Sequence, residues 1–211
     1  MKKLLFVLTV TVLFASVINA QKKDGGKGNI KFGVKVGPNF GSWAGEDTDV
    51  SGDEKKKLKL GLHGGVFAVI PISKMLSFQP ELLYSGQGVV YDDGDGTKYT
   101  YSTNHLNIPL GLRLQGGNWY GLLGPQVGFT LGGKLKVEYQ GDEYKEDLED
   151  LRGFIFSGII GVGYAAPNGW GAYIRYARAF SSVFDFDDYK GYHSTLSLSF
   201  FYMLSMMKEK K

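Results

Sequence analysis

Apolar and polar side chains alternate along most of this chain with a period of two residues. In eight runs, large apolar residues occupy every second position: 30–37, 58–72, 76–85, 106–115, 122–131, 154–163, 172–177 and 195–204. A β-strand sends successive side chains to opposite faces, so this period is typical of strands with one apolar and one polar face. We therefore predict eight β-strands.

The connections between these runs are alternately long and short. Three are short and rich in turn residues: Ser73-Lys74, Gly116-Gly117-Asn118 and Pro167-Asn168-Gly169. Four are longer and charged, and they hold 18 of the 21 acidic residues: 42–57, 92–97, 132–152 and 181–191. Glu81 is then the only acidic residue within a predicted strand.

This combination of strands and connections predicts the fold class. An even number of strands, short turns on one side, long loops on the other and an apolar face indicate an all-β, antiparallel up-and-down transmembrane β-barrel. The bilayer requires closure, because an open sheet edge in hydrocarbon leaves backbone groups unpaired at several kcal/mol each. The uncharged window 153–174 is not a membrane helix, because its six glycines and Pro167 disfavour one.

Two soluble folds are the alternatives, a β-sandwich with aromatic packing and a lipocalin-like barrel. A lipocalin-like barrel would have to place its apolar residues inside. Here the face opposite the leucines carries Lys, Arg, Glu and Gln, which favours a membrane barrel with an apolar outer wall.

Aromatic residues gather near the predicted strand ends. We expect two girdles at the membrane surfaces, one at the short-turn rim and one toward the long loops. The proposed members are Trp119, Trp170 and Tyr202 at the first rim and Tyr84, Tyr91 and Tyr99 at the second.

Composition agrees with this architecture. The 31 glycines among 211 residues are about 15%, roughly twice the usual share, and aromatic residues add 14%. Tight turns and a narrow lumen both favour glycine, and a wall with one apolar and one polar face accounts for the mean hydropathy of -0.13. The chain has no cysteine, which excludes a disulfide scaffold and a thiolate metal site.

The N-terminus has the pattern of a secretory signal peptide. Lys2 and Lys3 precede an apolar stretch over 4–18 that is too short to span a bilayer as a helix, and Asn19-Ala20 follows it. We predict a cleaved signal peptide at 1–20, a periplasmic segment at 21–29, an outer membrane barrel at 30–205 and a charged tail at 206–211. Cleavage leaves 22 basic against 21 acidic residues, a net charge of +1, which gives no argument for nucleic-acid binding.

Several short segments resemble a known family. They are FGVKVGPNF at 32–40, QPELLYS at 79–85, LNIPLGLR at 106–113, GPQVG at 124–128 and RY at 175–176. In this order and spacing they are similar to the outer membrane β-barrel domain of Bacteroidetes-type porin-family or PorT-like proteins. The resemblance implies insertion by the barrel-assembly machinery and no shared enzymatic activity. Such barrels commonly end on an aromatic residue, whereas here a charged tail follows the last strand.

The inward positions suggest a charged cluster in the lumen. One carboxylate, Glu81, faces several inward cations: Lys31, Lys35, Lys59, Arg113 and Arg175. Glu81 and Arg175 lie at similar heights above their turns, so we expect an ion pair between them. An eight-stranded barrel is just wide enough for side chains to fill. We expect this cluster to brace a filled lumen, with an ion or proton path as the alternative.

Other candidate sites receive less support. His63, His105 and His193 belong to three different predicted strands without ligand spacing, so we predict no metal site and no cofactor. The segment Asp92–Gly96 resembles half of a calcium loop, but it lacks the closing glutamate and is better explained as a hairpin turn. The acidic run 143–150 would either hold divalent cations that bridge lipopolysaccharide or form a solvated loop.

Three functions remain. The first is a structural or surface-interaction barrel that contacts an extracellular protein through loops 42–57 and 132–152. The second is a transport or secretion accessory, whose partner would be a secretion-system protein. The third is a lipid-modifying enzyme, which no nucleophile motif supports, so we predict no enzymatic activity. In every case we expect outer membrane lipid and lipopolysaccharide to surround the barrel.

Overall fold

The computed structural model describes residues 29–44, 55–148, 151–182 and 191–204. The predicted signal peptide at 1–20, the charged tail at 206–211 and all but residue 29 of the predicted periplasmic segment lie outside these ranges. In the described part no helix is long and apolar enough to cross a membrane.

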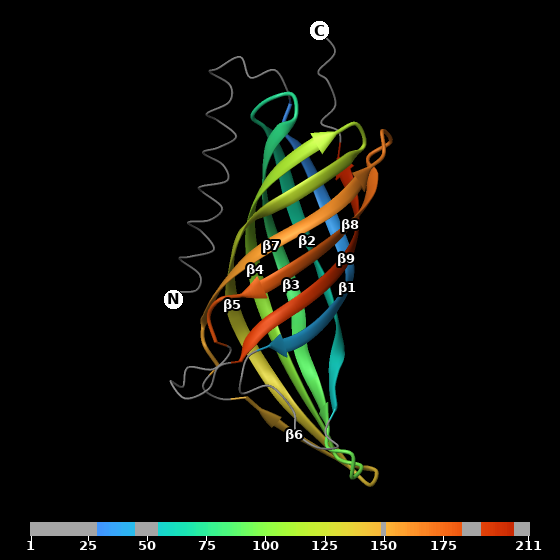
Figure 1. The fold of residues 1–211 in the computed structure, drawn as a ribbon, viewed down its shortest axis with the longest axis vertical. Coiled ribbons are helices and arrows are strands. Elements are labelled where there is room, and N and C mark those ends of the chain that lie inside the picture. The colour runs from blue at the N-terminus through green and yellow to red at the C-terminus, as the bar shows by residue number, and fades with distance from the viewer. Residues whose placement is uncertain (1–28, 45–54, 149–150, 183–190, 205–211) are drawn as a thin grey trace.

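Nine antiparallel strands make up the described structure (Figure 1). They are β1 Lys31–Ala44, β2 Lys55–Pro71, β3 Leu76–Asp92, β4 Lys98–Gly116, β5 Trp119–Tyr139, β6 Asp142–Asp147, β7 Phe154–Ala165, β8 Trp170–Ala179 and β9 Tyr192–Leu204. Eight of them pair in the ring β1-β2-β3-β4-β5-β7-β8-β9, and β9 pairs with β1 to close it. The prediction of an eight-stranded antiparallel barrel is therefore confirmed.

The three short connections form tight turns at one end of the barrel, as predicted. Gly117 and Gly169 have positive φ angles of 62° and 92°, which glycine adopts at little steric cost. The β7–β8 turn is closed by a hydrogen bond from the backbone N of Ala166 to the carbonyl of Trp170, at 2.8 Å.

One long connection differs from the prediction. We expected a loop over 132–152, but β5 continues to Tyr139 and the chain returns as β6, which pairs with β5 through all six of its residues. The loop prediction was wrong because the charges of the β5 part fall on one face of the strand only. Leu135 and Val137 alternate with Lys134, Lys136 and Glu138, which is again the period of a strand.

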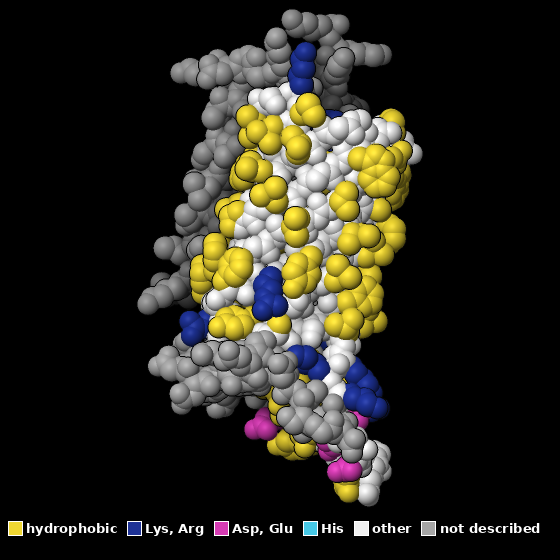
Figure 2. Space-filling model, viewed as in Figure 1, with side chains coloured by type: hydrophobic (Ala, Val, Ile, Leu, Met, Phe, Trp, Pro, Cys, Tyr) yellow, Lys and Arg dark blue, Asp and Glu magenta, His cyan; other side chains and the backbone are white. Residues whose placement is uncertain are grey.

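The outer wall of the ring is apolar, as Figure 2 shows for one face. Leu62, Leu123 and Ile160 are each at least 60% exposed, whereas their inward neighbours His63, Leu122 and Ile159 are buried. Arg178 is exposed on the outer wall one residue from the end of β8, and it pairs in register with Ser194, so it lies at the rim rather than in a bulge.

Inward glycines make room for large rings in the lumen. A Cβ on any of these glycines would clash with a neighbouring ring: Gly33 with Phe67, Gly161 with Tyr173, Gly163 with Tyr120 and Gly171 with Phe201. The eight-stranded ring is narrow, so each large inward ring lies over a strand position that has no side chain. This pairing explains much of the glycine and aromatic excess together.

Four strands, β2 to β5, extend past the ring on the long-loop side. β8 has 10 residues, whereas β4 has 19 and β5 has 21. A register shift at Asn104/His105, with Leu131 as the extra residue, bends the sheet where it leaves the ring. We call the projecting part the outer sheet: residues 55–58, 86–92, 98–104, 133–139 and β6.

Candidate functional site in the barrel lumen

A charged cluster occupies the lumen, centred on Glu81 of β3. The Glu81 side chain is fully buried, and both of its carboxylate oxygens accept hydrogen bonds. Oε1 accepts from Lys35 Nζ at 2.7 Å and from Gln79 Nε2 at 2.8 Å. Oε2 accepts from Arg175 Nη1 at 3.0 Å. Charge-assisted bonds of this kind are about twice as strong as neutral ones.

Arg113 joins the cluster indirectly. Its Nη1 donates to Gln79 Oε1 at 3.1 Å, so Gln79 links the guanidinium to Glu81. The guanidinium carbon also lies 3.6 Å from the centroid of the Tyr120 ring, in cation–π contact. Of the predicted residues, the structure thus brings together Glu81, Lys35, Arg175 and Arg113.

Lys59 is not part of this cluster. Glu81 pairs with Phe67 across β2 and β3, and Lys59 lies eight residues farther along β2, which is about 26 Å at strand spacing. Lys59 instead lies at the long-loop mouth, where its side chain approaches Gly88. The alternation places Lys59 on the inward face correctly but contains no information on height within the lumen.

Aromatic and aliphatic side chains fill the lumen around the charges. Tyr120 and Tyr173 stack with their ring centroids 5.6 Å apart, and Phe67 meets Phe201 edge to face at 5.6 Å. Lys35 Nζ lies 5.0 Å from the ring centroids of both Phe67 and Tyr173. These rings were not predicted, although their inward register and the glycines opposite them were a signal in the sequence.

A polar layer follows toward the long loops. Asn39 donates to Ser85 at 2.9 Å and accepts from Ser197 at 2.7 Å, so one amide connects β1, β3 and β9. The rings of His105 and His193 lie 4.9 Å apart. Their strands, β4 and β9, lie on opposite sides of the ring, and sequence spacing cannot reveal such a contact. Among the described residues, no three of His, Asp, Glu or Cys lie close enough together to hold a metal ion.

An aromatic cap closes the long-loop end of the lumen. Trp43 is 2% exposed and lies 5.0 Å from Tyr101 and 6.0 Å from His193, measured between ring centroids. Val89 and Tyr91 pack into the same cluster. The predicted girdle is therefore wrong for Tyr91 and for Tyr99, which lies on the same face of β4 as Tyr101. Because strands β3 and β4 extend beyond the ring here, their inner-face residues had been assigned to a membrane rim.

The remaining girdle residues lie on the outer wall. Trp119 and Trp170 are about 60% exposed at the short-turn rim, and Trp170 contacts Tyr202 with ring centroids 4.9 Å apart. Tyr84 is 50% exposed toward the long loops. Further outward rings at that level were missed by the sequence analysis: Phe129, Phe154, Phe156, Tyr176 and Phe180.

A comparison with protein families identifies the fold family. The model described as "Outer membrane protein beta-barrel domain" matches residues 19–185. This chain belongs to the outer membrane protein beta-barrel domain family. A search of curated proteins finds no match.

Several solved outer membrane proteins are similar in structure. Ail, the attachment invasion locus protein of Yersinia pestis, solved with the heparin analogue sucrose octasulfate, is 12% identical with a TM-score of 0.48, over 84% of this chain and 100% of Ail. Neisserial surface protein A is 12% identical with a TM-score of 0.47, over 83% and 99%. The translocator domain of the autotransporter NalP from Neisseria meningitidis is 12% identical with a TM-score of 0.28, over 92% and 97%.

Membership in the outer membrane β-barrel family orients the molecule. In these barrels the short turns face the periplasm and the longer loops face the outside. The outer sheet therefore lies outside the membrane. Its two faces differ, because residues paired across antiparallel strands share a face: Tyr91, Tyr99, Val137 and Tyr144 form a row on the lumen-side face.

Charged residues occupy the opposite face of the outer sheet. Lys136 Nζ lies 2.6 Å from Glu143 Oε2 and 3.1 Å from Glu138 Oε1, and Lys145 also contacts Glu143. Hydrogen bonds from Lys136 and then Lys145 lower the pKa of the Glu143 carboxyl below its usual value. The same bonds, to Glu143 first and Glu138 second, raise the pKa of Lys136. The hairpin's own lysines thus pair with part of the acidic run 143–150.

The β3–β4 connection is a hairpin turn built by its aspartates. Asp93 Oδ1 accepts hydrogen bonds from the backbone N of Asp95 at 3.0 Å and of Thr97 at 2.9 Å. Gly94 and Gly96 have positive φ angles of 83° and 99°. The neighbouring carboxylate, Asp92, pairs with Lys57. Because both carboxylates are bound by donors of the protein, as in an Asx turn, the geometry supports the turn interpretation over a calcium loop.

Proposed function

We propose that this outer membrane β-barrel is a non-enzymatic surface-interaction protein that contacts an extracellular protein through its outer sheet and long loops. The observation that carries the proposal is the excess strand length on one side. A membrane-crossing strand needs about 9–11 residues, which β8 matches, whereas β4 and β5 have 19 and 21. The excess supports a sheet outside the bilayer.

The chemistry of the outer sheet suits a protein partner. Its lumen-side face carries Tyr91, Tyr99 and Tyr144 in one row. Tyr91 packs into the aromatic cap, whereas Tyr144 at the edge strand is 62% exposed. Tyrosine is enriched in protein interfaces because its ring buries a large area at low entropy cost and its hydroxyl still hydrogen-bonds. Paired lysines and glutamates on the opposite face keep that side solvated.

The lumen supports the same proposal, because it offers no obvious path for a solute. We propose that the Glu81 cluster braces the wall, since its three direct donors come from β1, β3 and β8. Each of these strands lies on a different part of the ring. A buried carboxylate with this many charged partners holds them at fixed separations, and the packed rings around it fill the remaining width.

An adhesion assay tests the surface role. Cells carrying the protein and a deletion strain are compared on serum-coated polystyrene, together with Tyr144→Ser and its neighbour Lys145→Ser, which faces the other side of the sheet. We expect the protein to increase adhesion, Tyr144→Ser to reduce it and Lys145→Ser to leave it unchanged. Equal adhesion of the wild type and the deletion strain contradicts the proposal. Heat-modifiable migration on gels checks that each variant folds.

A transport or secretion accessory role, as in PorT-like proteins, is the second candidate, favoured by the segments quoted from 32–40 and 79–85. It requires either conductance or a secreted cargo that fails to leave a deletion strain. The lipid-modifying alternative requires a change in lipid A mass in that strain. We expect no conductance, no retained cargo and no change in lipid A mass. We also expect the outer wall to contact lipopolysaccharide and lipid, and the barrel-assembly machinery to bind the chain during insertion.

A further inference from the structure

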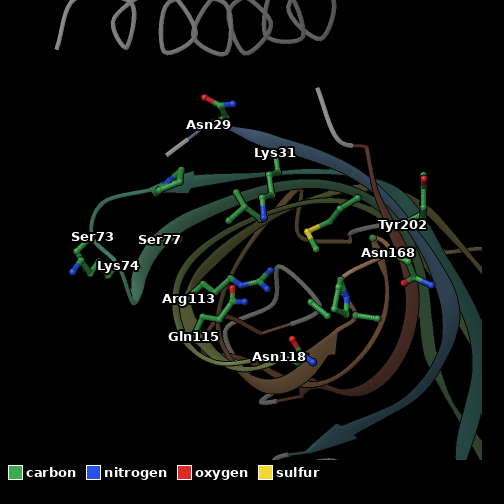
Figure 3. A pocket seen from close by; sticks show the side chains of 17 residues that line it. Asn29, Lys31, Ser73, Lys74, Ser77, Arg113, Gln115, Asn118, Asn168 and Tyr202 are labelled. Carbon is green, nitrogen blue, oxygen red and sulfur yellow. The ribbon is translucent and has the colours of Figure 1, made fainter. Parts of the chain in front are cut away.

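The periplasmic mouth of the barrel contains a cavity of about 600 Å³ between the short turns (Figure 3). Its lining combines cations, amides and hydroxyls. The cations are Lys31, Lys74 and Arg113, and the amides include Gln115, Asn118 and Asn168. No aspartate or glutamate is among the described residues that line it. Pockets of this size accommodate small organic ligands.

Arg113 forms the floor of the cavity. Its side chain points into the barrel in Figure 3, is 1% exposed, and leaves Nε without a hydrogen-bond partner. Among the described residues, the hydrogen-bond acceptor for its guanidinium is the neutral amide of Gln79. An unpaired N–H of a buried guanidinium, next to a polar cavity, is a donor available to an incoming anion.

The charge balance of the lumen favours the same kind of ligand. Three buried cations, Lys35, Arg113 and Arg175, face the single carboxylate of Glu81, and its oxygens already bind Lys35, Arg175 and Gln79. Buried charges are normally paired, because the low-dielectric interior penalises an excess of one sign. Within the described residues, Lys31 and Lys74 at the mouth add two positive charges without an acidic partner.

We propose that this cavity binds an anionic phosphate group, held by Arg113 from below and by Lys31 and Lys74 at the mouth. The planar guanidinium suits phosphate oxygens, the lysines act as point charges, and Asn118, Asn168 and Gln115 supply neutral donors. The cavity volume exceeds that of inorganic phosphate, so the ligand is a phosphate ester. It is either a soluble periplasmic ester or the headgroup of a phospholipid in the inner leaflet, and this inference does not depend on the proposed surface role.

Titration of the refolded full-length barrel with glycerol 3-phosphate, in an uncharged detergent, tests this site. We expect saturable binding that weakens with added salt. Lys31→Gln combined with Lys74→Gln should weaken it about tenfold, as expected for two lost surface charges. Both lysines are exposed and therefore removable without unfolding the barrel. The matched control is Lys98→Gln with Lys134→Gln, at the opposite end of the molecule, which should leave the dissociation constant unchanged.

Arg113→Gln should abolish binding, and the variants are compared only if they show heat-modifiable migration. Binding that is absent from the wild type, or equal in the wild type and the Lys31/Lys74 variant, overturns the proposal. Repeating the titration in nanodiscs distinguishes the two sources of phosphate. Phosphatidylglycerol that suppresses glycerol 3-phosphate binding, where phosphatidylcholine does not, identifies a lipid headgroup. Equal binding in both identifies a soluble ester.

Discussion

At the scale of single residues, the lumen is organised around one carboxylate. Glu81 is the only acid in the membrane part of the described strands, and every one of its contacts is to a donor on the inner wall. Removing the carboxylate leaves Lys35 and Arg175 buried without a counter-charge. Breaking a buried pair in this way costs about 3–5 kcal/mol, far more than a surface pair contributes.

We therefore expect Glu81→Gln to lower the stability of the barrel by about 3–5 kcal/mol. The measurement is the temperature at which the folded, fast-migrating form is lost on gels in detergent, or equilibrium unfolding in urea. Glu138→Gln is the control, because its carboxylate also pairs with a lysine but is 45% exposed. That variant should change stability by less than about 1 kcal/mol. Equal stability of Glu81→Gln and the wild type contradicts the bracing role.

The sequence predicted part of this cluster. The inward register of Glu81, Arg113 and Arg175 followed from alternation, and counting residues above the turns placed Glu81 and Arg175 at one height. Gln79 was not predicted, because its role depends on the position of Arg113 across the strand pair. The contact between His105 and His193 depends on closure of the ring, which no local pattern encodes.

At the scale of strands, backbone spacing is set by glycine at particular positions. A Cβ on Gly37 of β1 would clash with the carbonyl group of Leu198 on β9. It would also lie 3.0 Å from the Cα of Ser199. Backbone atoms cannot rotate aside as a flexible side chain can. The β1–β9 pairing closes the ring, so its geometry affects the whole barrel.

Gly37→Ala should therefore destabilise the barrel by about 1–3 kcal/mol, as overpacking does elsewhere. Urea unfolding of the refolded protein measures it. Gly121→Ala is the matched control, because a Cβ there has no atom within 4 Å, and it should stay within about 0.5 kcal/mol of the wild type. Destabilisation of both variants to the same extent would mean that strand spacing at the β1–β9 pairing is not responsible.

The β5–β6 hairpin carries a pH prediction. Because the folded-state pKa of Glu143 is lowered by Lys136 and Lys145, its stabilising contribution is present above the unfolded-state pKa. This contribution is lost as the pH falls through the folded-state pKa. The ion pairs of the hairpin should therefore persist at neutral pH and weaken under acid conditions. Lys136→Gln should raise the Glu143 pKa toward its ordinary value, which carboxyl ¹³C NMR titration measures. An unchanged pKa contradicts the pairing.

The strand ends were the least predictable elements. The charged segment 132–152 was expected to be a loop, yet Leu135 and Val137 continue the strand on the lumen-side face. The extra residue Leu131 shifts the register, so the inner face passes from even to odd numbers within β5. A single bulge therefore hid the continuation of β5. Tyr91 and Tyr99 were assigned to the outer girdle because β3 and β4 extend beyond the ring.

At the scale of the whole molecule, the barrel separates two environments with different chemistry. Cations and amides line the periplasmic mouth, and packed rings and one charge cluster fill the middle. The outer sheet projects beyond the ring at the other end (Figure 1). The fold class, the strand count of the ring and the short turns could be predicted, because alternation and turn residues are local signals. The outer sheet and the periplasmic cavity depend on three-dimensional placement.

Planar-bilayer recording of the purified barrel tests the central claim, that side chains fill the lumen and that function lies at the two ends of the molecule. The account predicts no stable unitary conductance steps, for the wild type and for the Lys31/Lys74 variant alike. Shortening the β5–β6 hairpin should not create steps, because the packed rings lie deeper in the barrel. Reproducible single-channel steps from the wild-type protein would contradict the account and favour a transport role.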